Sequence, residues 1–162
     1  MNNILSWEKL KKEVELRRLD GSKIVFTNGC FDIIHAGHVR YLQKAKNAGD
    51  VLIVALNSDS SMRKIKGEKR PIVPQKERAE VVASLKSVDY VTLFTEKTPI
   101  KLIEYLRPDI LVKGADWPED QIVGRDSVLS WGGKVFLIPV VKGVSTTKII
   151  EKILLAYNEH QS

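Results

Sequence analysis

The sequence predicts a single α/β domain, in which a doubly wound parallel sheet of about five strands carries helices on both faces. Segments of strand and helix character alternate along the chain, which is typical of consecutive βαβ units. The strand segments are apolar at consecutive positions, as in VLIVALNS at 51–58, which indicates strands covered on both sides. A chain of 162 residues can bury a core of its own, and no second domain, repeat or low-complexity tract is evident.

The first half of the chain supplies two helix-strand pairs. The predicted elements are, in order, a helix at 5–19, a strand at 23–29, a helix at 36–50 and a strand at 51–58. Leu10 and Val14 fall on one stripe of the first helix, with lysines opposite. In the second helix, Val39, Leu42 and Ala45 are expected to point inward. Residues 59–75 are polar, basic and interrupted by glycine and two prolines, so a long functional loop is expected there.

The second half continues the alternation. The predicted elements are a helix at 76–87, a strand at 90–94, a helix at 98–107, a strand at 109–114, a strand at 134–140 and a helix at 145–158, with 115–131 partly helical at best. Thr98 is expected to cap its helix, with Pro99 at the first helical position, and Ser145 is expected to cap the last helix.

Charge and composition narrow the class of partner. The net charge is +6, and much of the excess lies between Arg63 and Arg70. Aromatic residues make up only 7% and are not interleaved with that basic run, so a small phosphorylated ligand is favoured over nucleic acid. No apolar run is long enough to cross a membrane, the N-terminus does not resemble a signal peptide, and Cys30 is the single cysteine. These features predict a cytoplasmic protein without a membrane partner.

Small and polar residues follow four of the predicted strands. Because ligands of open parallel sheets bind beyond the carboxyl ends of the strands, these segments are expected to meet at one phosphate-binding rim. The segments are 27–31, 57–59, 113–116 and 142–147.

His35 and His38 are the candidate chemical groups of this rim. Their spacing places them on one face of the first helical turn, where imidazoles can donate hydrogen bonds to phosphate oxygens. The alternative is that one histidine packs and the other is solvated. Gly29 and Gly37, which leave room for a ligand against the backbone, favour the functional interpretation.

Two motifs carry a resemblance to a known family. GCFDIIHAGH at 29–38 resembles the first signature of the cytidylyltransferase-like nucleotidyltransferases, and GVSTTKII at 143–150 resembles their second. Further segments, such as LRPDILVKGADW at 106–117, are similar to the adenylyltransferase domain of bacterial ADP-heptose synthesis proteins. The resemblance covers nearly everything from Lys23 to Ile153 and implies a Rossmann-like fold. It implies an N-terminal helix extension at 1–22, a nucleotidyltransferase domain at 23–157 and a tail at 158–162.

The resemblance also implies a reaction. A heptose 1-phosphate would attack the α-phosphorus of ATP, giving ADP-heptose and pyrophosphate for lipopolysaccharide. Mg²⁺ is implied as a companion of ATP, held mainly by phosphate and water. The resemblance is to the form without a fused kinase, which implies a separate heptose 7-phosphate kinase, and relatives are commonly homodimers. Relatives that transfer cytidylyl groups carry Arg-Thr-Glu-Gly where residues 140–143 read Val-Val-Lys-Gly, which disfavours CTP. A cytidylyltransferase, another nucleotidyltransferase and a basic nucleic-acid-binding module remain alternatives.

Residue roles follow from the same resemblance. His35, His38 and Lys66 are the expected catalytic residues, with His38 nearer the α-phosphate, and Lys64 and Lys66 are expected to clamp the sugar phosphate as part of a mobile lid. The nucleotide is expected to contact Asn28, Gly29, Cys30, Phe31, His35, His38, Lys113, Gly114, Asp116, Ser145 and Thr146. No residue is assigned to a metal. Asp32 is expected to fix a turn or cap a helix, whereas Arg78, Thr147 and Trp117 are left open.

Overall fold

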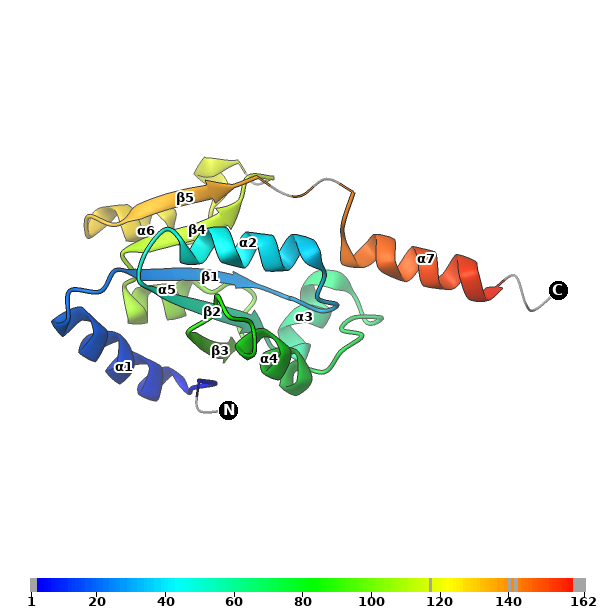
Figure 1. Ribbon diagram of the computed structural model, residues 1–162, viewed down its shortest axis with the longest axis horizontal. Coiled ribbons are helices and arrows are strands. Elements are labelled where there is room, and N and C mark those ends of the chain that lie inside the picture. Colours follow the sequence, from blue (N-terminus) through cyan, green and yellow to red (C-terminus); the bar gives the residue numbers. More distant parts are fainter. Residues whose placement is uncertain (1–2, 117, 140, 142, 159–162) are drawn as a thin grey trace.

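A parallel sheet of five strands, in the order β3-β2-β1-β4-β5, forms the middle layer of the protein (Figure 1). The computed structural model describes residues 3–116, 118–139, 141 and 143–158. The strands are β1 (Ile24–Gly29), β2 (Val51–Asn57), β3 (Tyr90–Phe94), β4 (Ile110–Gly114) and β5 (Lys134–Ile138). The helices are α1 (Trp7–Leu19), α2 (Ala36–Lys46), α3 (Asp59–Lys66), α4 (Gln75–Ala83), α5 (Ile100–Leu106), α6 (Arg125–Ser130) and α7 (Thr146–Asn158), with a 3₁₀ turn η1 at Glu119–Gln121. The doubly wound α/β fold is therefore confirmed.

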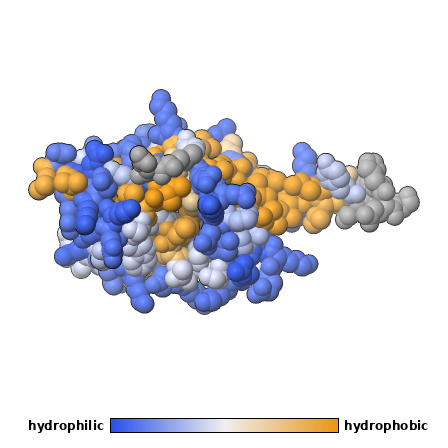
Figure 2. All heavy atoms as spheres, turned by 90° about the horizontal axis from the view of Figure 1, so that it is seen from below, coloured by the Kyte–Doolittle hydropathy of each residue, from blue (hydrophilic) through white to orange (hydrophobic). Residues whose placement is uncertain are grey.

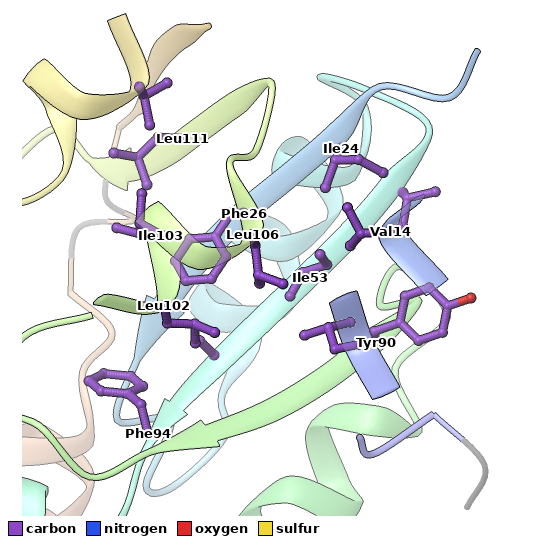
Figure 3. Close-up of a cluster of buried hydrophobic side chains, with 14 of the residues drawn as sticks. Val14, Ile24, Phe26, Ile53, Tyr90, Phe94, Leu102, Ile103, Leu106 and Leu111 are labelled. Carbon is purple, nitrogen blue, oxygen red and sulfur yellow. The ribbon is translucent and has the colours of Figure 1, made fainter. Parts of the chain in front are cut away.

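Both faces of the sheet are covered, and each has its own apolar core. On one face, α1, α5 and α6 pack against side chains such as Phe26 and Ile53, which are fully buried (Figure 3). On the other face, α2 and α4 cover Val54 and Val112, which are also fully buried. Alternate residues of one strand thus enter opposite cores, which explains why the strands are apolar at consecutive positions.

The N-terminal segment is built into this core. Leu10 and Val14 of α1 are fully buried, as the helical pattern predicts. Ahead of α1, the backbone runs beside β3, where Leu5 donates to the carbonyl of Val91 at 2.9 Å. The indole of Trp7 donates to the carbonyl of Leu93 at 2.8 Å. These bonds occupy the outer edge of β3, which would otherwise be an unpaired strand.

Three local expectations were wrong. Residues 59–75 are not all loop, because α3 forms at their start, with the hydroxyl of Ser58 accepting from the Ser61 amide at 3.1 Å. Thr98 does not cap α5, whose N-cap is Pro99 without a side-chain bond. Val39 does not point into the core; it is 40% exposed, whereas Leu42 and Ala45 are fully buried.

The last helix differs from the others. None of the α7 residues from Thr146 to Tyr157 is buried, and Figure 1 shows the helix running away from the body of the protein.

Candidate active site

A pocket of about 700 Å³ opens at the carboxyl ends of β1 and β4. The strand order switches sides at β1, because β2 pairs with one edge of β1 and β4 pairs with the other. The loops after the two strands diverge there, which leaves a crevice between them. The predicted site residues that line it are Asn28, Gly29, Cys30, Phe31, His35, His38, Lys66, Lys113, Gly114, Asp116, Ser145 and Thr146.

Lys64 lies outside this group. It is exposed on α3 and does not line the pocket, whereas Lys66 does. Residues two apart on a helix point to different sides, so the helix that replaces the expected loop separates the two lysines. The expected role of Lys64 as a phosphate ligand therefore has no support from its position.

The imidazole rings of His35 and His38 are stacked, with centroids 3.8 Å apart and planes inclined by 26°. His35 is the N-cap residue of α2 and has an extended backbone, and His38 lies one turn further on and contacts the ring of Phe31 at 5.1 Å between centroids. Nδ1 of each histidine is buried, with no hydrogen-bond partner among the described residues. These two atoms are not open to the pocket, but both side chains line it, so a ligand there can contact the imidazole rings.

Burial keeps both histidines neutral in the free protein. It lowers the pKa of His38 to about 4, with a further contribution from the neighbouring His35. It also lowers the pKa of His35 below its ordinary value. A polyphosphate in the pocket would oppose this shift, because negative charge favours the imidazolium form.

Gly29 and Gly37 have no side chains, and the rings of Phe31 and His35 occupy the space that a side chain at these positions would need. A Cβ at Gly37 would lie 2.9 Å from Nδ1 of His35, and a Cβ at Gly29 would lie 2.8 Å from the ring of Phe31. Real Cβ atoms do not approach so closely, so any side chain would displace a ring that lines the pocket. Phe31 itself has a φ of 46°, a left-handed conformation that costs energy for a bulky residue.

Asp32 fastens the pocket to the segment after α3. Its side chain is fully buried and accepts from Nε of Arg70 at 2.5 Å and from the amides of Ile72 and Val73 at 2.9 and 2.8 Å. Burial alone would raise the pKa of this carboxyl, but the two amides and Arg70 outweigh it and hold the pKa below its ordinary value. Asp32 does not cap α2, whose N-cap residue His35 makes no side-chain bond. It fixes a different turn, one that starts 38 residues later in the chain.

Arg78 is a buried structural residue rather than a ligand of the pocket. It is 1% exposed and does not line the cavity. Its guanidinium donates to the carbonyls of Cys30, Asn57 and Val73 and forms an ion pair with Asp59 at 2.8 Å. It therefore holds together the ends of β1 and β2 and the segment before α4.

Lys113 and Asn28 join the ends of β4 and β1 inside the pocket. The ammonium group of Lys113 donates to the side-chain oxygen of Asn28. Burial lowers the pKa of Lys113 to about 8. Because this pKa lies close to neutral pH, a small fraction of Lys113 is uncharged there. A bound anion would favour the charged form.

The hydroxyl-bearing turn before α7 meets the histidine loop. The Ser145 hydroxyl accepts from the Lys148 amide at 3.1 Å, which makes it the expected cap of the helix. The Thr146 hydroxyl donates to the carbonyl of Ile33 at 3.3 Å. Two signatures far apart in the sequence therefore share one pocket, with unpaired amides of a helix start available for an anion.

The pocket includes residues that the sequence interpretation did not name. Those that it did not assign to the site include Tyr41, Arg70, Lys97, Thr98, Gln121, Ile122 and Val123, whereas Asn57 was expected at the rim and lines the pocket. Lys97 and Thr98 follow the carboxyl end of β3, so the same topological rule could have found them. Arg70 is brought in by its bond to Asp32, which has no signal in the sequence.

Cys30 shows no sign of reactivity, because burial raises the pKa of its thiol.

Within the described ranges, no group of three or more His, Cys, Asp or Glu side chains could hold a metal ion. The predictions on Trp117, Val140 and Lys142 concern residues outside those described. No helix in the described part of the chain has both the length and the apolar character to cross a membrane.

Comparisons with known proteins fit this geometry. The family model "Cytidylyltransferase-like" matches residues 26–152. The chain is 56% identical over 146 residues to the bifunctional protein HldE of Geobacter metallireducens, covering 90% of this chain and 30% of that protein. It is 51% identical over 160 residues to the HldE protein of Trichlorobacter lovleyi, covering 99% and 33%. The chain thus spans about a third of the length of these curated relatives.

A solved structure agrees in fold. The crystal structure of the lipopolysaccharide core biosynthesis protein from Thermoplasma volcanium GSS1 superimposes with a TM-score of 0.63 and 31% identity. The match covers 76% of this chain and 100% of that one. The family model matches more than half of the chain, and the fold and the pocket agree with it. The chain therefore belongs to the cytidylyltransferase-like family and is a nucleotidyltransferase.

Proposed function

We propose that the protein is an adenylyltransferase that joins ATP to D-glycero-β-D-manno-heptose 1-phosphate, giving ADP-heptose and pyrophosphate for lipopolysaccharide synthesis. The observation that carries the transferase chemistry is the meeting of the His35–His38 pair with the Ser145–Thr146 turn in one pocket. The heptose substrate is supported by the motifs shared with the adenylyltransferase domain of ADP-heptose synthesis proteins. The likeness to a lipopolysaccharide core biosynthesis protein supports the same pathway.

The reaction needs alignment of two anions more than a nucleophile from the protein. A phosphate oxygen of the sugar would attack the α-phosphorus in line, and the bond to pyrophosphate would break on the opposite side. His35 and His38 would donate to the triphosphate from their positions in the lining of the pocket. The start of α7 would hold the terminal phosphates with backbone amides and the hydroxyls of Ser145 and Thr146.

Cations of the pocket would balance the remaining charge. Lys66 lines the pocket and would meet the sugar phosphate, and Lys113 and Asp116 lie at and just after the end of β4, where the nucleoside is expected. The described residues do not form a metal site of their own, so Mg²⁺ would enter as the magnesium complex of ATP. We place the reaction in the cytoplasm, the compartment of ATP, with the heptose 1-phosphate supplied through a separate heptose 7-phosphate kinase activity.

Pyrophosphate release tests this proposal. The protein would be assayed with ATP or CTP, each paired with heptose 1-phosphate, glucose 1-phosphate or glycerol 3-phosphate. We expect the ATP and heptose 1-phosphate pair to react fastest, with ADP-heptose identified by mass spectrometry. His38→Ala should lower kcat about 100- to 1,000-fold, as loss of one donor to a developing charge does.

The other outcomes have definite meanings. Preference for CTP would replace the adenylyltransferase with a cytidylyltransferase, and preference for another phosphate would replace the heptose. Tight oligonucleotide binding with no turnover of any pair would favour the nucleic-acid-binding alternative.

A further inference from the structure

The two sides of the pocket differ in what the proposed function assigns to them. The strand order places β4 and β5 on one side of β1, and β2 and β3 on the other. ATP is assigned to the loop after β1, to the end of β4 and to the turn before α7. The segments after β2 and β3 contribute a wall to which little has been assigned. We call Asn57, Lys66, Arg70, Lys97, Thr98 and Pro99 the β2–β3 wall.

The acceptor, meaning the sugar phosphate, needs a side of the pocket of its own. In an in-line displacement, the attacking oxygen and the leaving pyrophosphate lie on opposite sides of the α-phosphorus. The turn before α7 is the proposed site of the terminal phosphates, so the acceptor must approach from elsewhere. The β2–β3 wall lies across β1 from the end of β4, where the nucleoside is expected, and is therefore free for the acceptor.

The cations of the pocket are not equally available to this second anion. Among the described residues, the cationic side chains that line the pocket are Lys66, Arg70, Lys97 and Lys113. The charge of Arg70 is balanced by its ion pair with Asp32 at 2.5 Å, and Lys113 donates to Asn28. The ammonium groups of Lys66 and Lys97 have no hydrogen bond or ion pair with a described residue. These two lysines can therefore bind an incoming anion without breaking a contact.

The last helix does not supply comparable charge. Lys148 and Lys152 of α7 do not line the pocket. Beyond its first turn, α7 shows a largely hydrophobic surface on the arm that projects from the body (Figure 2). The positive charge that meets the acceptor must therefore come from the segments at the carboxyl ends of the strands.

The segment that carries Lys97 is fixed to α3, the helix that ends at Lys66. The fully buried hydroxyl of Ser61 in α3 donates to the carbonyl of Glu96 at 2.7 Å, one residue before Lys97. The same hydroxyl accepts from the side-chain amide of Asn57 at 3.0 Å. The backbone next to Lys97 thus has a defined place beside α3, while its side chain is exposed and lines the pocket.

We propose that Lys97 is a second ligand of the acceptor's phosphate, so that Lys66 and Lys97 hold it from the segments after β2 and β3. This inference rests on the proposed function, because it takes the acceptor to be a phosphate monoester. Such a group carries close to two negative charges at neutral pH, which two lysines balance. Lys97 takes the part that was predicted for Lys64, which does not line the pocket.

The Lys97→Gln variant tests the assignment by kinetics. The acceptor is whichever phosphate monoester gives the fastest pyrophosphate release with the unchanged protein. We expect the KM for that acceptor to rise about tenfold, as for loss of a hydrogen bond to a charged group, and the KM for ATP to stay the same. Lys97→Arg keeps the charge and should bring the KM back to within about threefold of its original value.

Lys101→Gln is the matched control for this variant. Lys101 lies four residues further on, its side chain is 72% exposed and pairs with Glu96 at 4.0 Å, and it does not line the pocket. Equal effects of Lys97→Gln and Lys101→Gln, or an equal rise of both KM values in Lys97→Gln, would overturn the assignment. No turnover of any pair by the unchanged protein would contradict the proposed function, and a measurement without turnover then decides on Lys97.

Chemical labelling provides that measurement. The full chain would be acetylated alone and with heptose 1-phosphate, inorganic phosphate or the unreactive analogue α,β-methylene-ATP, and the rate at each lysine would be read by mass spectrometry. We expect either phosphate compound, near saturation, to slow acetylation of Lys97 about tenfold and to leave Lys101 unchanged. Protection of Lys97 by neither phosphate compound, or by the ATP analogue alone, would overturn the proposal.

Discussion

The carboxylate of Asp32 holds the guanidinium of Arg70 at 2.5 Å, although the two residues lie on separate loops. Asp32 belongs to the histidine signature, and Arg70 belongs to the basic segment after α3. Both line the pocket, so this ion pair ties the two walls of the site together.

Removing the charge of Asp32 should therefore weaken both stability and binding. We expect Asp32→Asn to lower the free energy of unfolding by about 3 kcal/mol, since it leaves Arg70 without its buried partner. Denaturant titration would measure this, with Glu15→Gln as a control that breaks the exposed Lys11–Glu15 pair and costs less than about 1 kcal/mol. Because the folded-state pKa of Asp32 is lowered, its contribution to stability is present at neutral pH and is lost as the pH falls through that pKa. Equal losses in the two variants would contradict this assignment.

Gly37 offers a change that separates activity from stability. Gly37→Ala should stabilise α2 by up to about 1 kcal/mol, because alanine is the better helix former. The added Cβ would displace the His35 ring from its position 2.9 Å away. We expect kcat/KM to fall on the order of 100-fold, as for a small misplacement of a group that positions substrate. Thermal unfolding and turnover measured on the same sample would show the split, and full activity would mean that His35 does not need its present position.

Lys66 and Lys64 form a matched pair on α3. Lys66 lines the pocket and Lys64 does not, although both are exposed lysines of one helix. We expect Lys66→Ala to lower kcat/KM for the sugar phosphate about 100-fold and Lys64→Ala to change it less than threefold. Steady-state kinetics with the sugar phosphate varied would measure both effects. A comparable loss in both variants would support the predicted clamp of Lys64 and Lys66 on the sugar phosphate.

The pH dependence of kcat/KM should reflect the titration of Lys113. Its pKa in the free protein is about 8, so it loses its positive charge as the pH rises through that value. We expect kcat/KM for ATP, which reports the free enzyme, to fall above about pH 8. Lys113→Arg should remove this basic limb, because arginine stays protonated. An unchanged limb in that variant would assign the titration to another group.

Sequence reasoning succeeded for the strands and for the two signatures. The consecutive apolar residues of β2 indicated a strand buried on both faces, and the carboxyl-end rule then predicted that His35, Lys113 and Ser145 lie at one rim, where they share a pocket. The spacing of His35 and His38 predicted neighbouring side chains, and the rings are stacked.

The missed helix α3 and the unassigned Arg78 share a physical cause, which is that polar contacts between separate segments have no sequence pattern. α3 buries little apolar surface and is fastened by Ser58 and by mutual bonds between Asp59 and Gln75, so its polar sequence looked like a loop. Arg78 could not be assigned from sequence, because most of its partners are main-chain carbonyls that any residue would provide.

The bond between Thr146 and Ile33 joins parts of the chain that leave the ribosome far apart in time. A growing polypeptide that has emerged only as far as β5 has its sheet and its histidines but not the turn that meets them. If that turn binds nucleotide, as proposed, a chain that has emerged only as far as β5 would not yet bind it.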